Sequence, residues 1–158
     1  MIIVLFGQPH SGKTTLSDEL FQYIDPQTTH FIDGDELRNI FKNKDFSREG
    51  RLKNLQKASD IAAYLNSTGA DVILSVVYPY KEARDYLNSI TSNVNWVYLH
   101  YTGERGREQF HVKDFELDLL EEKVLSLNTS ELSIEECIDQ IIEYVNYQDT
   151  GMFRMYYR

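Results

Sequence analysis

Gly7-Gln8-Pro9-His10-Ser11-Gly12-Lys13-Thr14 is the stretch that decides the fold. It follows the apolar run Met1 to Phe6 and precedes a helical pattern from Leu16 to Ile24. A glycine, four spacer residues and then Gly-Lys-Ser/Thr, set between a strand and a helix, form the Walker A pattern of phosphate-binding loops. The alternative interpretation is an ordinary glycine-rich turn, but the complete motif in its proper setting favours the phosphate loop.

The residue types of this loop suit ATP with Mg²⁺. Glycines allow the backbone N–H groups to point inward, and the positive end of the following helix dipole adds to them. Lys13 is predicted to reach the β- and γ-phosphates and to act in catalysis, and the Thr14 hydroxyl is the predicted Mg²⁺ ligand. His10 is interpreted as a spacer rather than a catalytic base. The predicted ATP-binding residues of the loop are Gly7, His10, Ser11, Gly12, Lys13, Thr14 and Thr15.

Length and composition exclude several classes of protein. The 158 residues, 42% hydrophobic and 26% charged, suit one domain with one packed core. Without an apolar run of membrane-spanning length or a secretory signal, we expect a cytoplasmic protein with no membrane contact. A formal net charge of −9 argues against nucleic-acid binding, so positive charge for phosphate substrates must gather locally. Cys137 lies in an apolar helix stripe, which favours a core role over a nucleophile.

Strands and helices alternate along the chain. This order predicts an α/β P-loop NTPase fold, a five-stranded mostly parallel sheet with helices on both faces, built as one kinase domain over residues 1–158. The polar stretch 102–113 lacks apolar periodicity and is predicted to be a mobile lid. The aromatic and basic end, 152–158, is expected to pack on the body or on a dimer partner rather than to contact a ligand. Strands are expected at 2–6, 28–33, 71–77, 94–100 and 124–127, and helices from the loop to 24, at 36–41, 47–69, 81–90 and 133–147.

Asp33-Gly34-Asp35 is predicted to end the second strand, at the sheet edge where open α/β folds place ligands. An acidic group beside an acceptor hydroxyl, with nearby cations, is what phosphoryl transfer needs. Arg38 follows Asp35 by about one helical turn and would face the same crevice. The alternative is a common Asp-Gly-Asp turn. The short chain, its late polar insertion and the lack of a clear strand ending in a Walker B aspartate favour a compact small-molecule kinase.

Three segments resemble the adenylylsulfate (APS) kinase family. They are Asp33-Gly34-Asp35-Glu36-Leu37-Arg38, Phe46 through Asn54, and Val72 through Lys81, which includes Val77-Tyr78-Pro79-Tyr80. The family combines a P-loop with an Asp-Gly-Asp-x-x-Arg segment, a Phe-Ser segment with arginine five and asparagine eight residues on, and a strand ending in Ser-Pro-Tyr or Ser-Pro-His. The resemblance covers about residues 1–100 strongly and resumes weakly near Phe110 and from Leu125 onward.

The resemblance implies an ATP- and Mg²⁺-dependent kinase that phosphorylates the 3′-hydroxyl of APS, a small-molecule acceptor, and that forms a homodimer, as APS kinases commonly do. Asp35 would orient or deprotonate that hydroxyl, and Phe46 would stack on the adenine. A hydrophobic staple at a helix start is the alternative role for Phe46. Arg105 would join the ATP site. The implied substrate-binding residues are Asp35, Arg38, Phe46, Arg51, Asn54, Val77, Tyr78, Arg107 and Phe110.

The chain departs from the family at three places. Tyr78 replaces the serine before Pro-Tyr, Gly50 replaces an aspartate, and the lid is shorter, with Arg105, Arg107 and Lys113 as its cations. These departures keep two other functions open. One is a P-loop kinase acting on another nucleotide or a small alcohol, and the other is a nucleotide-binding protein without turnover.

Overall fold

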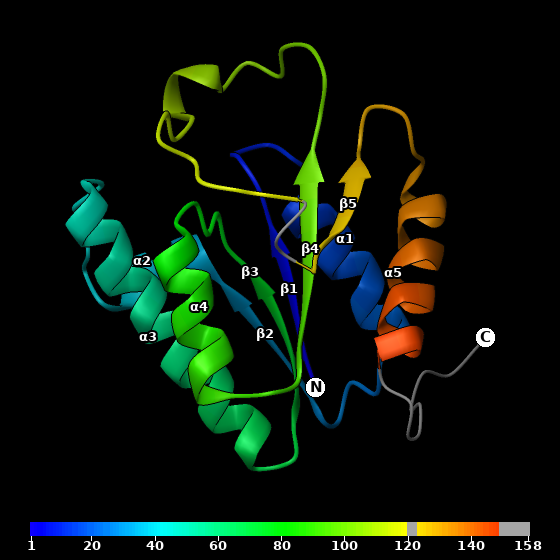
Figure 1. Ribbon diagram of the computed structural model, residues 1–158. Helices are drawn as coiled ribbons and strands as arrows, with labels where there is room; N and C mark the ends of the chain where they lie inside the picture. Colours follow the sequence, from blue (N-terminus) through cyan, green and yellow to red (C-terminus); the bar gives the residue numbers. More distant parts are fainter. Residues whose placement is uncertain (120–122, 149–158) are drawn as a thin grey trace.

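The computed structural model describes residues 1–119 and 123–148, so the predicted packing of 152–158 lies outside the described residues. Five parallel strands form one sheet in the order β2-β3-β1-β4-β5, and helices cover both faces (Figure 1). This confirms the predicted fold class. Within the described residues no helix is long and apolar enough to cross a membrane.

The sheet is built around β1 (Ile2–Phe6), whose five residues are all buried. It lies between β3 (Asp71–Ser75) and β4 (Val94–His100), while β2 (Thr29–Asp33) and β5 (Leu125–Asn128) form the edges. A strand buried on both faces reads as a continuous apolar run, which is why β1 and β3 were recognisable in the sequence.

Each face of the sheet has its own apolar core. On one face α1 (Lys13–Leu20) packs beside α5 (Ile134–Gln148), and on the other α3 (Arg48–Ser67) packs beside α4 (Lys81–Ile90) (Figure 1). The short helix α2 (Gly34–Ile40) contacts α3, and single 3-10 turns occur at Phe21–Tyr23 and Glu108–Phe110. Cys137 is buried in the α1–α5 core, as predicted, and burial raises the pKa of its thiol.

The starts of α3 and α5 follow capping rules. Ser47 caps α3 by accepting from the Gly50 N–H. Before α5, Ser133 accepts from the Glu136 N–H while the Glu136 carboxylate accepts from the Ser133 N–H, a capping box. Most predicted boundaries are confirmed within two residues. Two elements end earlier than predicted. Helix α1 ends at Leu20 and continues as a 3-10 turn, and β3 ends at Ser75 rather than at 77.

Candidate active site

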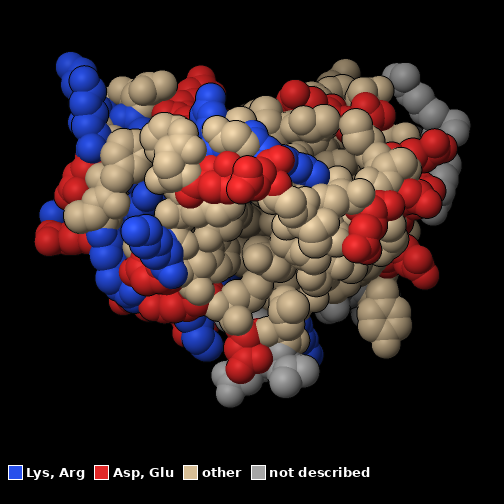
Figure 2. Space-filling view, turned by 90° about the horizontal axis from the view of Figure 1, so that it is seen from above, with Lys and Arg blue, Asp and Glu red and all other residues tan. Residues whose placement is uncertain are grey.

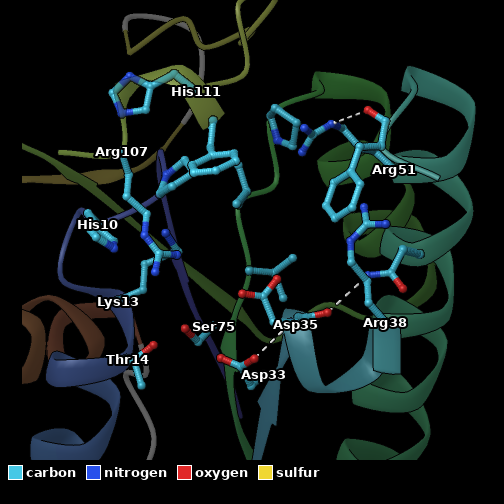
Figure 3. Close-up of a pocket in the computed structure, with 18 of the residues that line it drawn as sticks. His10, Lys13, Thr14, Asp33, Asp35, Arg38, Arg51, Ser75, Arg107 and His111 are labelled. Carbon is cyan, nitrogen blue, oxygen red and sulfur yellow. Dashed lines mark hydrogen bonds between the residues drawn. The ribbon is translucent and has the colours of Figure 1, made fainter. Parts of the chain in front are cut away.

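A cavity of about 1020 Å³ opens at the carboxyl ends of the central strands. Asp33 of β2 pairs in register with Ser75 of β3, which in turn pairs with Leu5 of β1, so these three strands end at one level. Figure 3 shows Lys13 and Thr14 on one side of the cavity and Asp33, Asp35, Arg38 and Arg51 on the other. The predicted donor and acceptor groups therefore face one another, as open α/β sheets arrange their ligands.

The phosphate loop depends on a glycine at its first position. Gly7 has φ of 149°, and a Cβ at this residue would collide with the carbonyl oxygen of Leu99 in β4. Its N–H donates to the carbonyl of Val77, which fixes the loop to the end of β3. The loop therefore begins in a conformation and a space that only glycine fits.

Lys13 folds back over the loop. Its Nζ donates to the carbonyls of Gly7 and Gln8 at 3.1 and 2.8 Å, and it lies 3.4 Å from the Ser11 Oγ. Burial lowers the pKa of Lys13 to about 8, against an opposing effect of Asp35 and Asp33. An anion held by this ammonium group would compensate the desolvation, so the arrangement suits a phosphate.

The remaining loop residues divide into two groups. Thr14 and Thr15 are exposed and line the cavity with Gly12 and His10, whereas Gly7 and Ser11 are buried and support the loop from beneath. Ser11 accepts a hydrogen bond from the Thr129 hydroxyl through its carbonyl. The Nδ1 of His10 lies 3.2 Å from the carbonyl oxygen of Arg105, and its role as a spacer stays a prediction.

The Asp-Gly-Asp segment both starts α2 and lines the cavity. Asp33 caps the helix by accepting from the N–H groups of Asp35 and Glu36, and both bonds go to its Oδ1. Among the described residues no hydrogen bond reaches its second carboxylate oxygen, so this oxygen is available to a ligand. Asp35, one residue into the helix, is exposed at the cavity (Figure 3). The turn and the functional interpretation are therefore compatible, because one carboxylate builds the turn and the other faces the cavity.

Two arginines lie against the ring of Phe46, across the cavity from Lys13 and Thr14 (Figure 3). The guanidinium carbons of Arg38 and Arg51 lie 4.4 and 5.5 Å from the ring centroid. Backbone carbonyls hold both: Arg38 donates to Asp45 at 2.9 Å and Arg51 to Phe46 at 2.9 Å. Burial is the main cause that lowers the pKa of Arg38, and repulsion by Arg51 lowers it further. Two cations held this close favour an anion beside a flat aromatic surface.

Asn54 and Ser75 are cavity residues with unsatisfied oxygen atoms. The Asn54 amide donates to the Gly34 carbonyl at 3.5 Å, but its Oδ1 and the Ser75 Oγ are buried and have no hydrogen-bond partner among the described residues. Buried polar atoms of this kind are usually satisfied, so both oxygens indicate a place for ligand or water. Sequence reasoning missed Ser75, although it is a polar residue in an apolar strand.

The prediction for Tyr78 needs a correction. Its side chain is fully buried beneath the site, its hydroxyl lies 2.6 Å from the Ser59 Oγ, and its ring packs edge-on against Trp96. Its neighbours Val77 and Pro79 line the cavity, but the tyrosine ring does not. The backbone at Tyr78 has φ of 44°, which turns the large side chain into the core instead of toward the substrate.

Gly50, the second departure from the family pattern, also has a structural reason. A Cβ at residue 50 would collide with the side chain and carbonyl of Asp45. Asp45 is held there by accepting from the Ser47 N–H at 2.9 Å. The connector before α3 therefore fills the space that a larger residue at position 50 would need.

Several residues of the segment 102–113, named here the lid segment, border the cavity. Arg105, Arg107, Phe110 and His111 line the cavity, whereas Lys113 does not. Arg105 stacks on Tyr101 at 4.3 Å and donates to the carbonyls of His10 and Thr129. Phe110 is 58% exposed and Phe46 59%. The rings of Phe46 and Phe110 thus border the same cavity with large open faces.

The surface charge is uneven, as the sequence required for phosphate substrates. Seen from above the cavity, most Lys and Arg side chains lie on the α2–α3 side, interspersed with acidic ones, while acidic side chains dominate the side of α5 (Figure 2). The net charge of −9 therefore coexists with arginines at the cavity, among them Arg38 and Arg51. Outside the cavity, Arg48 bonds to Glu82 and Glu116 and joins α3, α4 and the chain after the lid segment.

Comparison with known proteins agrees with this geometry. A family model described as adenylylsulphate kinase matches residues 1–110. Cytidine diphosphoramidate kinase of Campylobacter jejuni is 28% identical over 160 residues, which cover 90% of this chain and 94% of that protein. Adenylyl-sulfate kinase of Staphylococcus carnosus is 25% identical over 169 residues, with 94% and 85% covered.

Solved structures show the same fold. The Mycobacterium tuberculosis APS kinase, solved in complex with AMPPNP and APS, superposes with a TM-score of 0.76 at 17% identity, covering 91% of this chain and 96% of that one. The match of the family model over well more than half of the chain, together with these relatives, decides the assignment. The chain belongs to the adenylylsulphate kinase family of P-loop phosphotransferases.

Proposed function

We propose that this protein transfers the γ-phosphoryl group of ATP to the 3′-hydroxyl of a nucleotide with a short anionic tail, and that APS is the first candidate acceptor. The observation that carries the proposal is the single cavity in which the phosphate loop faces Asp35, Arg38, Phe46 and Arg51. The phosphate loop by itself would indicate only one ligand, the donor nucleotide. The second ligand is inferred from the aromatic ring between two guanidinium groups, because this arrangement suits a nucleotide base with an anionic tail.

On the donor side, Lys13 would hold the β- and γ-phosphates with the loop N–H groups, and Arg105 would border the ATP site beside His10. The side chains in reach also fit Mg²⁺, which prefers oxygen ligands and keeps several waters and phosphate oxygens. Thr14 would be the direct ligand, with Asp33 Oδ2 and Ser75 Oγ placed to bind its waters. When bound, the ion would neutralise charge on the β- and γ-oxygens.

On the acceptor side, Asp35 would orient the attacking hydroxyl and accept its proton. Arg38 and Arg51 would hold the anionic tail, and Phe46 would stack on the base, with Asn54 offering its Oδ1 to the ribose side. Phosphoryl transfer depends mainly on such positioning and on charge stabilisation. Arg107 and Phe110 of the lid segment would complete the enclosure and limit attack by water.

A second acceptor, cytidine diphosphoramidate, is supported by a specific observation. The relative that acts on it matches nearly the full length of both chains at 28% identity. The chain departs from the APS kinase pattern in the short lid segment, which borders the cavity, and at Tyr78, whose buried hydroxyl does not reach the cavity. Flat stacking on Phe46 and Phe110 would accept a pyrimidine as well as a purine.

The test is an acceptor panel with Mg-ATP, scored by ADP release and by mass spectrometry of the acceptor. We expect ADP release that depends on APS or on cytidine diphosphoramidate and an acceptor heavier by one phosphate. AMP and CMP, which lack the second anionic group, should be much poorer acceptors. Asp35→Ala serves as the inactive control.

Each outcome separates the hypotheses. Faster turnover with cytidine diphosphoramidate than with APS would favour cytidine diphosphoramidate as the acceptor. Turnover with a small alcohol alone would favour the wider class of P-loop kinases. Nucleotide binding without acceptor-dependent ADP release, unchanged in Asp35→Ala, would overturn the kinase proposal and favour a nucleotide-binding protein without turnover.

A further inference from the structure

The first three of the four spacer residues after Gly7 all bond to the lid segment or to the residue before it. The Gln8 side chain exchanges two hydrogen bonds with the backbone of Val112: its Nε2 donates to the carbonyl at 2.8 Å and its Oε1 accepts from the N–H at 2.9 Å. Tyr101 donates through its hydroxyl to the Pro9 carbonyl at 3.3 Å. The side chain of Arg105 donates to the His10 carbonyl at 2.9 Å.

The Gln8 contact is the most specific of the three. A primary amide that donates and accepts at one residue copies the pairing of a neighbouring strand, so it fixes both the position and the orientation of the backbone at Val112. Val112 is itself buried in the core on the α3–α4 face. The far end of the lid segment is therefore held by the core and by the phosphate loop together.

The near end is held by Arg105. This side chain bonds to His10 and Thr129 and stacks on Tyr101, whose hydroxyl also lies 2.9 Å from Nε2 of His111. Both ends of the lid segment thus rest on the loop that binds the donor phosphates. Between these ends lie Arg107 and Phe110, which face the cavity.

Gln8 differs from Arg105 in one useful respect. Arg105 lines the cavity, so its loss would mix effects on ligand contact and on lid position. Gln8 does not line the cavity, and both hydrogen-bonding ends of its side chain are directed at Val112. Any effect of its side chain on the reaction must therefore pass through the lid segment.

We propose that Gln8 is a positioning residue that anchors the lid segment to the phosphate loop and so sets how well the acceptor competes with water for the γ-phosphoryl group. The inference rests on the proposed kinase function. With the anchor in place, Arg107 and Phe110 are held over the cavity and water is limited. Without it, the far end of the lid segment keeps the core contact of Val112 but loses its bonds to the phosphate loop, and water reaches the donor more often.

The first experiment measures lid position without any catalysis. Trypsin can cut the lid segment after Arg105, Arg107 and Lys113, and it can cut α3 after Lys53 or Lys57. In Gln8→Ala, loss of both hydrogen bonds should raise the rate of lid cleavage relative to α3 cleavage by about tenfold. Gln22→Ala is the matched control, because Gln22 is exposed and bonds only locally, to Glu19. It should behave as the wild type.

The second experiment measures coupling. The ratio of ATP hydrolysis to phosphoryl transfer should rise about tenfold in Gln8→Ala, while ATP affinity changes little. Gln8→Glu keeps the size of the side chain and the acceptor for the Val112 N–H but sets a carboxylate against the Val112 carbonyl. It should show the same changes even if Gln8→Ala folds poorly.

The outcomes distinguish this inference from the proposed function. Lid cleavage that rises in both Gln8 variants supports the anchor even if no acceptor is turned over. Equal lid cleavage in the wild type, Gln8→Glu and Gln22→Ala would overturn it. So would a fall in thermal stability in which lid and α3 cleavage rise together, since that would show only a structural role.

Discussion

The two halves of the cavity are built in different ways. On the donor half, buried backbone holds the loop, with Gly7 bonded to Val77 and Ser11 fully enclosed. On the acceptor half, long and partly exposed side chains form the site, with Phe46 open to solvent between two arginines. Backbone geometry fixes a phosphate site with little freedom, whereas exposed side chains can be exchanged without disturbing the fold. The difference explains why the phosphoryl donor is easier to assign than the acceptor.

Removing the cation of the donor half should have the largest effect. Lys13→Ala takes away the ammonium group that neutralises charge on the transferring phosphoryl group, so kcat should fall by about 10³-fold. Steady-state kinetics with a saturating acceptor measure this. Lys44→Ala, at an exposed lysine that does not line the cavity, is the control and should leave kcat unchanged. A kcat near the wild-type value in Lys13→Ala would refute the role of the loop in catalysis.

The carboxylate of the acceptor half should come next. Asp35→Asn keeps the shape of the side chain but removes its capacity to accept the hydroxyl proton, and kcat should fall by about 10²-fold. ATP affinity, measured by calorimetry, should stay within twofold because the loop is untouched. Glu36→Gln, at the exposed neighbour in α2 that does not line the cavity, should leave kcat and ATP affinity unchanged. Loss of ATP binding in Asp35→Asn would contradict the division into two halves.

The aromatic ring tests whether the acceptor half binds a base. Phe46→Ala should raise the KM for the acceptor by about 10- to 100-fold, because stacking on one base is worth about 1–3 kcal/mol. The KM for ATP should not change. Phe31→Ala, on the edge strand β2 and outside the cavity, provides the comparison. If both KM values rise together in Phe46→Ala, the ring serves the start of α3 rather than the base.

The smallest effect concerns pH on the donor half. Burial lowers the pKa of Lys13 to about 8, so its charge is present below pH 8 and is lost as the pH rises through that value. Because bound phosphates favour the charged form, nucleotide binding should take up a proton, and affinity should fall about fourfold from pH 7 to pH 8.5. Calorimetry in buffers of different ionisation enthalpy measures the proton directly. No proton uptake near pH 8 would show that Lys13 is already charged in the free protein.

Local sequence patterns determined much of this protein. The Walker A motif, the buried strands, the Ser47 cap and the cap of α2 depend on residues within a few positions of one another, where backbone geometry and hydrogen bonding act directly. These same patterns placed Lys13, Thr14, Asp35, Arg38, Phe46 and Arg51 at one edge of the sheet, and the structure brings these residues to one cavity.

Only the tertiary structure decided the rest. Tyr78 points into the core because Ser59 and Trp96 offer a buried partner and a ring to pack against, which its neighbours in sequence do not reveal. Asp45 fills the space beside Gly50, and Gln8 bonds to Val112, which lies 104 positions away in sequence. Such contacts depend on which surfaces the folded sheet and helices bring together, and that is not encoded in the spacing of any single segment.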